Sequence, residues 1–553
     1  MNKTLLPCAL AAAVVLACGS ASAAQLILLN GDTGTGTGLD DATPKAPQGL
    51  NPGTTLGEQR RIVYQFAMDM WGAVLQSDVP IKVAASFQPL TCTPTQGVLG
   101  SAGGNWIDRD FPNAPLAGLW YNSALADSLA GSDLDPVVGD PADIVSRFNG
   151  DLGKPNCLAG FDWYYGLDGK TPANSINFLN VVTHEIGHGL GFQGTISKTT
   201  GAFGDFDGTG PRSDAYTQNA FDNVVNLGFN DPAMTSEQRA LAMRTPGRLV
   251  WSGGHVTTEA ALVLDRRQMF TVSAPAAIAG NYLFGTATFG ALPTPANFNG
   301  TVVLGIDPSD TAGASTTDAC SPLSNASAVA GHIVLVDRGT CGFIVKALNV
   351  QNAGGTAMVA ADNAAGSPPP DLGGVDPTIT IPAIRITLDA GNAFKANLPV
   401  TAGFVVSPTL LQGADDSGHV RLYAPPVVAS GSTFSHYDTV LTPNAIMEPF
   451  DTPTEQAQVN IDLTPALLRD TGWRINTGNA IINNCNTTVD VVADGGLVFG
   501  ANVQSWNDIC STTTSGKSAY TQCMDAYKTR ALASGILVGN QGGKVLSCAA
   551  KRK

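Results

Sequence analysis

The sequence predicts an α+β domain with a mixed sheet and one functional helix, interrupted by an α/β unit and followed by a small cysteine-containing tail. Residues 25–264 mix strand and helix patterns and include one helix that carries several side chains able to bind a metal ion. Between 265 and 412, strands alternate with a helix, which is typical of a self-contained α/β unit. Four cysteines gather after residue 476. A chain of 553 residues is longer than a single domain usually is. We therefore expect a main domain of residues 25–264 and 413–475, an insertion of 265–412 and a tail of 476–553.

Residues 1–24 have the parts of a secretory signal peptide. Lys3 is positive, the stretch from Leu5 to Cys18 is apolar, and Ala21-Ser22-Ala23 is a small-residue cleavage site. An alternative is a bacterial lipoprotein signal at Val15–Cys18, which would leave a lipid anchor on Cys18. No apolar run reaches the roughly 20 residues of a membrane span. The prediction is a secreted protein, extracellular or periplasmic, without a transmembrane segment.

The acidic composition limits the classes of partner. The formal net charge is −15, the sequence pI is about 4.7, and charged residues make up 14% of the chain. Because no basic patch is available to neutralise phosphates, nucleic acid is excluded as the expected partner. Composition gives no indication of the oligomeric state.

The cysteines predict disulfide bonds. Eight remain after the signal peptide, and an even number in an exported chain favours pairing. Their grouping along the chain suggests Cys92–Cys157, Cys320–Cys341 and two bridges within the last four, whose connectivity stays open. These last four are Cys485, Cys510, Cys523 and Cys548. A cysteine-based zinc site is not expected because C-x-x-C is absent.

The expected elements follow in chain order from hydrophobic periodicity. In the main domain we predict a strand, a helix and two further strands at Gln25–Leu29, Leu56–Leu75, Val79–Ala85 and Asp143–Phe148. In the insertion we predict a strand, a helix and two strands at His332–Val336, Phe343–Ala353, Thr356–Ala361 and Thr378–Ile384. In the tail we predict one helix, Ala519–Ala533, followed by glycine-rich turns.

The helix with potential metal ligands contains His184-Glu185-Ile186-Gly187-His188 and continues into Gly189-Leu190-Gly191-Phe192. Residues four apart share a helix face, so His184 and His188 can present two imidazoles to one metal ion, with Glu185 beside it. The apolar side of this helix includes Phe178, Val181, Val182 and Ile186. We expect Asn174 or Ser175 to cap its start and the two glycines to end it.

A catalytic zinc ion takes three protein ligands and keeps one position for water. Gly194 stands six residues after His188, so the third ligand must come from elsewhere. His255 and His419 lie in glycine-containing turns, and His332 begins a strand. His436 is the best candidate, because Met447 follows eleven residues later in a turn closed by Pro449.

At these residues the chain resembles the leishmanolysin-like metzincin zinc peptidases, in which H-E-x-x-H with G-x-G-F is separated by an insertion from the third His. Met447 would then be the methionine of the turn that supports the metal ligands. The segment 331–343, Gly-His-Ile-Val-Leu-Val-Asp-Arg-Gly-Thr-Cys-Gly-Phe, with Lys346 and Ala353-Gly354-Gly355, resembles the protease-associated (PA) domain. His436 stands 248 positions after His188, which is an unusually long gap for the peptidase family.

The resemblance implies hydrolysis of peptide bonds in protein or peptide substrates. Zn²⁺ would be held by His184, His188 and His436. Glu185 would be the general base, acting on a bound water without an acyl-enzyme. No G-x-S-x-G for a serine nucleophile is present.

Three alternatives stay open. A carboxylate, Glu237 or Glu259, could replace the third His. The protein could instead be a non-catalytic exported binding protein that docks partners through its PA domain. A weak calcium-loop pattern, Asp205-Phe206-Asp207-Gly208-Thr209-Gly210, adds Ca²⁺ as a possible second metal, although the twelve-residue loop with its closing Glu is missing.

Overall fold

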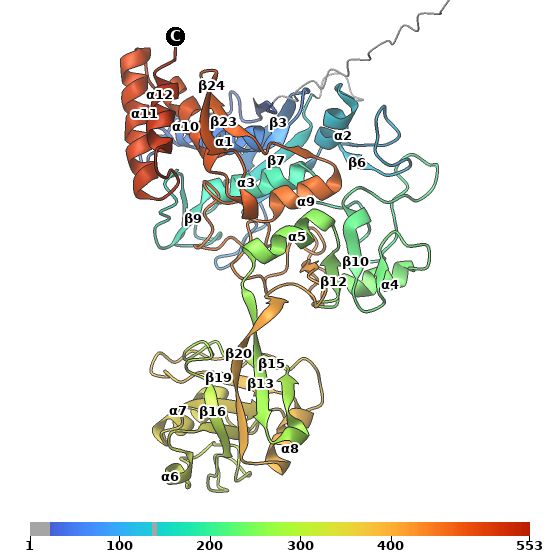
Figure 1. Cartoon of the computed structure of the whole chain (residues 1–553), viewed down its shortest axis with the longest axis vertical. Coiled ribbons are helices and arrows are strands. Elements are labelled where there is room, and N and C mark those ends of the chain that lie inside the picture. The colour runs from blue at the N-terminus through green and yellow to red at the C-terminus, as the bar shows by residue number, and fades with distance from the viewer. Residues whose placement is uncertain (1–22, 135–140) are drawn as a thin grey trace, which may run out of the picture. The chain divides into compact units, whose positions relative to one another are not determined.

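The computed structural model describes residues 23–134 and 141–553, which divide into two compact units (Figure 1). The larger unit combines the chain up to Leu264 with Gly413–Lys553, and the smaller unit is Asp265–Gln412. Almost all of the predicted signal peptide, including Cys18, lies outside the described residues. Within the described part of the chain, no helix is both long and apolar enough to cross a membrane.

A mixed four-stranded sheet forms the centre of the larger unit. Its strands follow the order β1 (Leu26–Asn30), β3 (Ile81–Gln88), β7 (Ile144–Asn149) and β4 (Gly100–Gly104). The first three are parallel and β4 runs antiparallel at the edge. In β3, every second side chain is buried, which is the pattern of a strand with one face on a core.

Two helices pack together beside this sheet. They are α1 (Leu56–Val74) and α3 (Phe178–Gly189). Helix α1 contacts β1 and α3, and α3 contacts β7 and β4. Thr55 and Glu58 form a capping box at the start of α1, which satisfies amide groups that have no partner within the helix. The sheet and α1 therefore hold α3 against the edge strand β4.

A second, antiparallel sheet joins the chain on either side of the insertion. Its order is β11 (Leu227–Gly228), β10 (Ala220–Asp222), β12 (Leu249–Trp251) and β21 (Val420–Arg421). Strand β12 precedes the smaller unit and β21 follows it, and the two are paired. The neighbouring helices are α4 (Ser236–Ala242), α5 (Gly254–Val263) and α9 (Thr464–Thr471).

Shorter elements complete the region before the tail. They are helix α2 (Ser123–Ala130) and the strand pairs β2 (Leu75–Gln76) with β22 (Arg474–Ile475), β5 (Ile107–Asp108) with β6 (Tyr121–Asn122), and β8 (Asp162–Tyr164) with β9 (Ser175–Asn177).

The C-terminal tail is more helical than the sequence predicted. A hairpin of β23 (Asn479–Ile482) and β24 (Cys485–Asp490) precedes three helices, α10 (Phe499–Thr513), α11 (Gly516–Ala533) and α12 (Gln541–Ala549). The prediction of one helix followed by turns was wrong, because α12 forms despite Gly542 and Gly543 near its start. Helix α10 packs against α1, so the tail belongs to the larger unit.

Four disulfide bonds join the eight cysteines of the described residues, and the predicted grouping is confirmed. Cys92 bonds to Cys157 and Cys320 to Cys341. The two tail bridges, whose connectivity the sequence left open, are Cys485–Cys548 and Cys510–Cys523.

The smaller unit is an α/β structure built on one eight-stranded sheet. The order is β14 (Gly280–Tyr282), β13 (Arg266–Ala274), β20 (Val400–Leu411), β16 (Asn299–Leu304), β17 (Ile333–Asp337), β18 (Ala357–Ala361), β19 (Ala383–Ile386) and β15 (Phe284–Thr286). The neighbours among β16 to β19 are parallel. Its helices are α6 (Ala326–Val329), α7 (Phe343–Asn352) and α8 (Leu388–Ala396).

The central strands β17, β18 and β19 of this sheet are buried on both faces. Alternate residues of β17 enter two different cores, with Ile333 and Leu335 in one and Val334 and Val336 in the other. Such strands are apolar without alternation, which is why they were visible in the sequence. The predicted strand at 378–384 was misplaced, because β19 begins only at Ala383, after Pro382.

Candidate metal centre

Helix α3 carries the first two histidines. It begins after Asn177, whose side chain accepts a hydrogen bond of 3.0 Å from the amide of Leu179. The expected caps, Asn174 and Ser175, were wrong because residues 175–177 first pair with β8 as strand β9. The helix ends at Gly189, as expected.

The turn after the helix orients His188. Gly191 has a φ of +116°, a value that favours glycine, and the chain bends back there. The carbonyl oxygen of Phe192 then lies 2.9 Å from Nδ1 of His188. The G-x-G-F sequence therefore supplies a partner that fixes the ring of the second histidine.

His436 joins the pair from the far side of the insertion. Its Nδ1 lies 2.9 Å from the carbonyl oxygen of Ser432, and Nδ1 of His184 lies 2.7 Å from that of Ile446. Each of the three rings thus has a carbonyl acceptor at Nδ1, which requires Nδ1 to carry the proton. In neutral imidazoles, Nε2 is then a bare acceptor on every ring.

The three Nε2 atoms converge on one point. Their separations are 3.0 Å for His184–His188, 3.2 Å for His188–His436 and 3.2 Å for His184–His436. These contacts cannot be hydrogen bonds, because no proton is available between the nitrogen atoms. Three nitrogen ligands at 2.0–2.1 Å from a tetrahedral zinc ion stand about 3.4 Å apart. The donor set therefore fits zinc.

The environment keeps all three rings neutral. Burial lowers the pKa of His184 to about 4 and that of His188 to about 3, and the pKa of His436 falls well below its ordinary value for the same reason. Neutral imidazole is the form that binds metal ions, so these rings need not lose a proton at neutral pH.

Glu185 lies between α3 and β4. It is 5% exposed, and burial raises its pKa to about 8, opposed by a hydrogen bond from the backbone of Ala102 in β4. Its Oε2 has no hydrogen-bond partner among the described residues. A Cβ at Gly100 would lie 2.8 Å from Oε1, so glycine at this position permits the close approach of β4.

Met447 packs against helix α3 at Gly187. It is fully buried, and a Cβ at Gly187 would stand 2.9 Å from its Sδ. The glycine between the two histidines therefore makes room for the methionine. The preceding residue, Ile446, donates its amide to the Asp462 carboxylate at 2.6 Å while its carbonyl meets His184.

The other candidate ligands lie apart from this centre. Among residues 23–134 and 141–553, the triad is the one group of three or more His, Cys, Asp or Glu side chains able to hold a metal ion. His419 pairs with Asp415 at 3.2 Å, and Glu259 approaches Arg469 at 4.0 Å. Glu237 lies in the first turn of α4.

The predicted calcium loop finds no support. Nε of Arg109 donates to Asp207 at 2.8 Å, so the carboxylate that would bind the cation already has a cationic partner. Asp207 is open to solvent. The hydrogen bond from Arg109 lowers the pKa of this carboxyl group to about 2.

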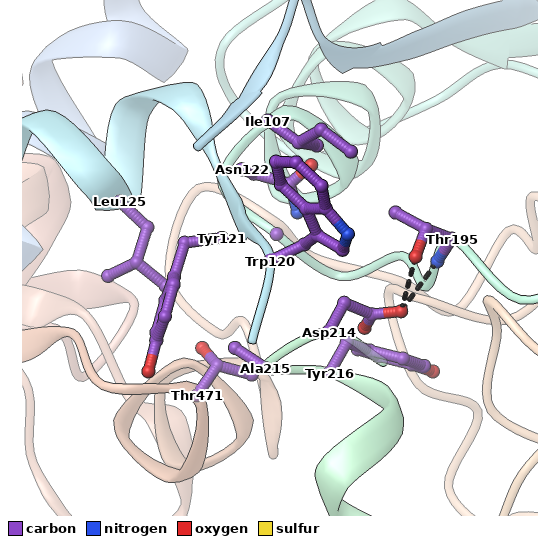
Figure 2. A pocket seen from close by; sticks show the side chains of 11 residues that line it. Ile107, Trp120, Tyr121, Asn122, Leu125, Thr195, Asp214, Ala215, Tyr216 and Thr471 are labelled. Carbon is purple, nitrogen blue, oxygen red and sulfur yellow. Dashed lines mark hydrogen bonds between the residues drawn. The ribbon is translucent and has the colours of Figure 1, made fainter. Parts of the chain in front are cut away.

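A small cavity is lined by Gly191 of the turn after α3 and by residues that include Trp120, Thr195 and Asp214 (Figure 2). Its volume is about 10 Å³, which suits one water molecule and no substrate group. Trp120 reaches into it, and Thr195 donates its amide and hydroxyl to Asp214, each at 2.8 Å. The cavity therefore offers no room for a substrate.

Several residues of the centre were missed from the sequence. No local motif marks the Asp462 carboxylate, which accepts the amide of Ile446. The same holds for Ala102 and Gly100, whose main chain approaches Glu185. Gly187 stood inside the motif, and its contact with Met447 could not be inferred from spacing.

One family model matches part of the chain. Residues 298–394 match the family model of the PA domain, which confirms that resemblance. No curated protein has a significant match to the chain.

Solved structures show only distant likeness. BSAP, a zinc aminopeptidase from Bacillus subtilis, is 17% identical over 28% of this chain and 36% of its own, with a TM-score of 0.20. An aminopeptidase from Aneurinibacillus sp. strain AM-1 is 19% identical over 28% and 38%, with a TM-score of 0.18. The subtilisin-like protease Apa1 from Pseudoalteromonas sp. AS-11 is 14% identical over 48% and 52%, with a TM-score of 0.19. The chain spans little more than a third of the two aminopeptidases.

Proposed function

We propose that this protein is a secreted, zinc-dependent endopeptidase of the leishmanolysin-like metzincin type. The observation that carries the proposal is the convergence of three bare Nε2 atoms beside a buried glutamate. Met447 under the helix and the position of His436 after the insertion support the same family. Four disulfide bonds are consistent with an extracellular protein.

His184, His188 and His436 would hold the zinc ion. A zinc ion bound there supplies a Lewis acid for the scissile carbonyl and lowers the pKa of its water to about 7. With zinc bound, the positive charge of the ion would favour the ionised form of Glu185 against the effect of burial, and the carboxylate would then accept the proton of the attacking water and pass it to the leaving amine. Its unpartnered Oε2 is available for this proton, and burial excludes competing solvent.

The edge strand β4 suits a peptide substrate. Among the described residues, β7 is its one partner strand, and the backbone of Ala102 hydrogen-bonds to Glu185. An extended peptide can bind such an edge through main-chain hydrogen bonds, which require no particular side chains. This arrangement would bring a peptide carbonyl near the metal centre.

Digestion of denatured casein by the purified, zinc-loaded chain tests the function. We expect Glu185→Gln to lower cleavage by at least about 100-fold while zinc content and folding stay unchanged. Glu237→Gln, on the exposed start of α4, is the matched control and should cut at the wild-type rate.

Cleavage by Glu185→Gln at the wild-type rate would refute the assigned role. If the wild type binds zinc and cuts nothing, the alternative of a non-catalytic exported protein that docks partners through its PA domain is favoured.

A further inference from the structure

Lys198 stands beside the metal centre and was not part of any sequence motif. It follows the metal helix by nine residues, and its Nζ donates to the carbonyl oxygens of Ser430 at 3.1 Å and Gly431 at 3.5 Å. Burial and the neighbouring histidine rings are the main causes of the lowered pKa of His188 and His436, and the positive charge of Lys198 contributes to both.

The ammonium group lacks a negative partner. Lys198 forms no ion pair within the described chain, and the shift of its pKa to about 8 is caused by burial alone. A partly desolvated charge is costly unless an opposite charge or hydrogen bonds compensate it. Two carbonyl oxygens use two of its three N–H groups, which leaves one donor for a ligand.

The position of this donor is fixed relative to the metal site. The carbonyls of Ser430 and Gly431 directly precede Ser432, whose own carbonyl orients His436. The lysine backbone is also held, because Ser197 pairs with Ala202 across a tight turn. A group of opposite charge bound at Lys198 would therefore lie at a defined place next to the third ligand.

We propose that Lys198 binds a carboxylate of the substrate near the scissile bond, an inference that rests on the proposed peptidase function. A lysine ammonium is a compact point charge suited to one carboxylate oxygen. The carboxylate could be an Asp or Glu side chain or the free C-terminus of a peptide.

Matched synthetic peptides test this proposal. They would be built around the casein bond that the wild type cuts fastest, with Glu or Gln placed in turn at each of the three positions on either side. A neutral version would be made with a free C-terminal carboxylate and with an amide. Side-chain recognition appears as a Glu preference in amidated peptides, and terminal recognition as a preference for the free carboxylate.

The variants are Lys198→Met, which removes the charge, and Lys198→Arg, which keeps it. Lys517→Met, at the exposed start of α11, is the matched control. We expect the wild type to prefer one carboxylate-bearing peptide by about ten-fold in kcat/KM, the scale of a hydrogen bond to a charged group. Lys198→Met should lose this preference and cleave the neutral peptides as the wild type does, and Lys198→Arg should retain most of it.

Equal cleavage of charged and neutral peptides by the wild type would overturn the proposal. A Lys198→Met variant that slows all peptides equally would also overturn it, since that result indicates only support of the Ser430–Ser432 segment. If no peptide or protein is cut by the zinc-loaded wild type, the peptidase function itself fails, which is a distinct result.

Discussion

Gly187→Ala tests directly whether Met447 supports the metal helix. An alanine Cβ at this position would stand 2.9 Å from Sδ and 3.4 Å from Cε of Met447, whereas the next atom, Cζ2 of Trp71, is 3.9 Å away. Carbon atoms pack best at about 3.5–4.0 Å, so the methionine alone must give way. The substitution is otherwise compatible with the helix.

The expected free energies follow from this single conflict. Overpacking in a buried site costs about 1–3 kcal/mol, and replacing a helical glycine by alanine returns about 1 kcal/mol. We therefore expect Gly187→Ala to destabilise the wild type by about 0–2 kcal/mol. In a Met447→Ala background the conflict is absent, and the same change should stabilise by about 1 kcal/mol.

A double-mutant cycle measures the difference. Urea unfolding of the four zinc-free proteins at 25 °C gives the free energies of unfolding without the contribution of metal binding. The coupling between the two positions should equal the overpacking cost, about 1–3 kcal/mol. Additivity within about 0.5 kcal/mol would refute the contact and the role assigned to Met447.

Three further predictions concern ligands and charge. His436→Ala should lose stoichiometric zinc in equilibrium dialysis while Glu259→Ala keeps it, and zinc retained at wild-type affinity by the first variant would remove the third ligand. Asp462→Asn should weaken zinc binding by about 10–100-fold. The Asp462 carboxylate accepts hydrogen bonds from two main-chain amides, and in the variant one of these amides would face an NH₂ group, which would shift the Ile446 carbonyl relative to His184. Unchanged zinc affinity would contradict this. Burial raises the pKa of Glu455 to about 9, so its neutral form is preferred in the folded state, and the associated stability is complete below about pH 4.5 and lost as pH rises towards 9. Glu455→Gln should therefore gain more than about 1 kcal/mol over the wild type between pH 5 and 8.5 in urea unfolding, and an equal difference at both pH values would contradict the assignment.

Local patterns in the sequence predicted some of the regular elements. The helix at 56–74 and the buried strands of the smaller unit follow from hydrophobic periodicity, which depends only on near neighbours. The errors arose where tertiary contacts decide. Residues 175–177 became a strand because β8 was available to pair with them, and α12 forms in a glycine-containing segment anchored by the Cys485–Cys548 bridge.

In the metal centre, too, some features follow from local sequence and others from tertiary contacts. The spacing of the motif was enough to place His184 and His188 on one helix face, with Glu185 between them in the sequence, because a helix repeats every 3.6 residues. The place of His436, whose Nε2 lies 3.2 Å from Nε2 of each of the other two rings, follows from tertiary packing. The same is true of Met447 in the space at Gly187 and of Lys198, which has no ion-pair partner among the described residues. These are contacts between segments far apart in the chain, and their geometry depends on how the whole larger unit packs, which no local spacing encodes.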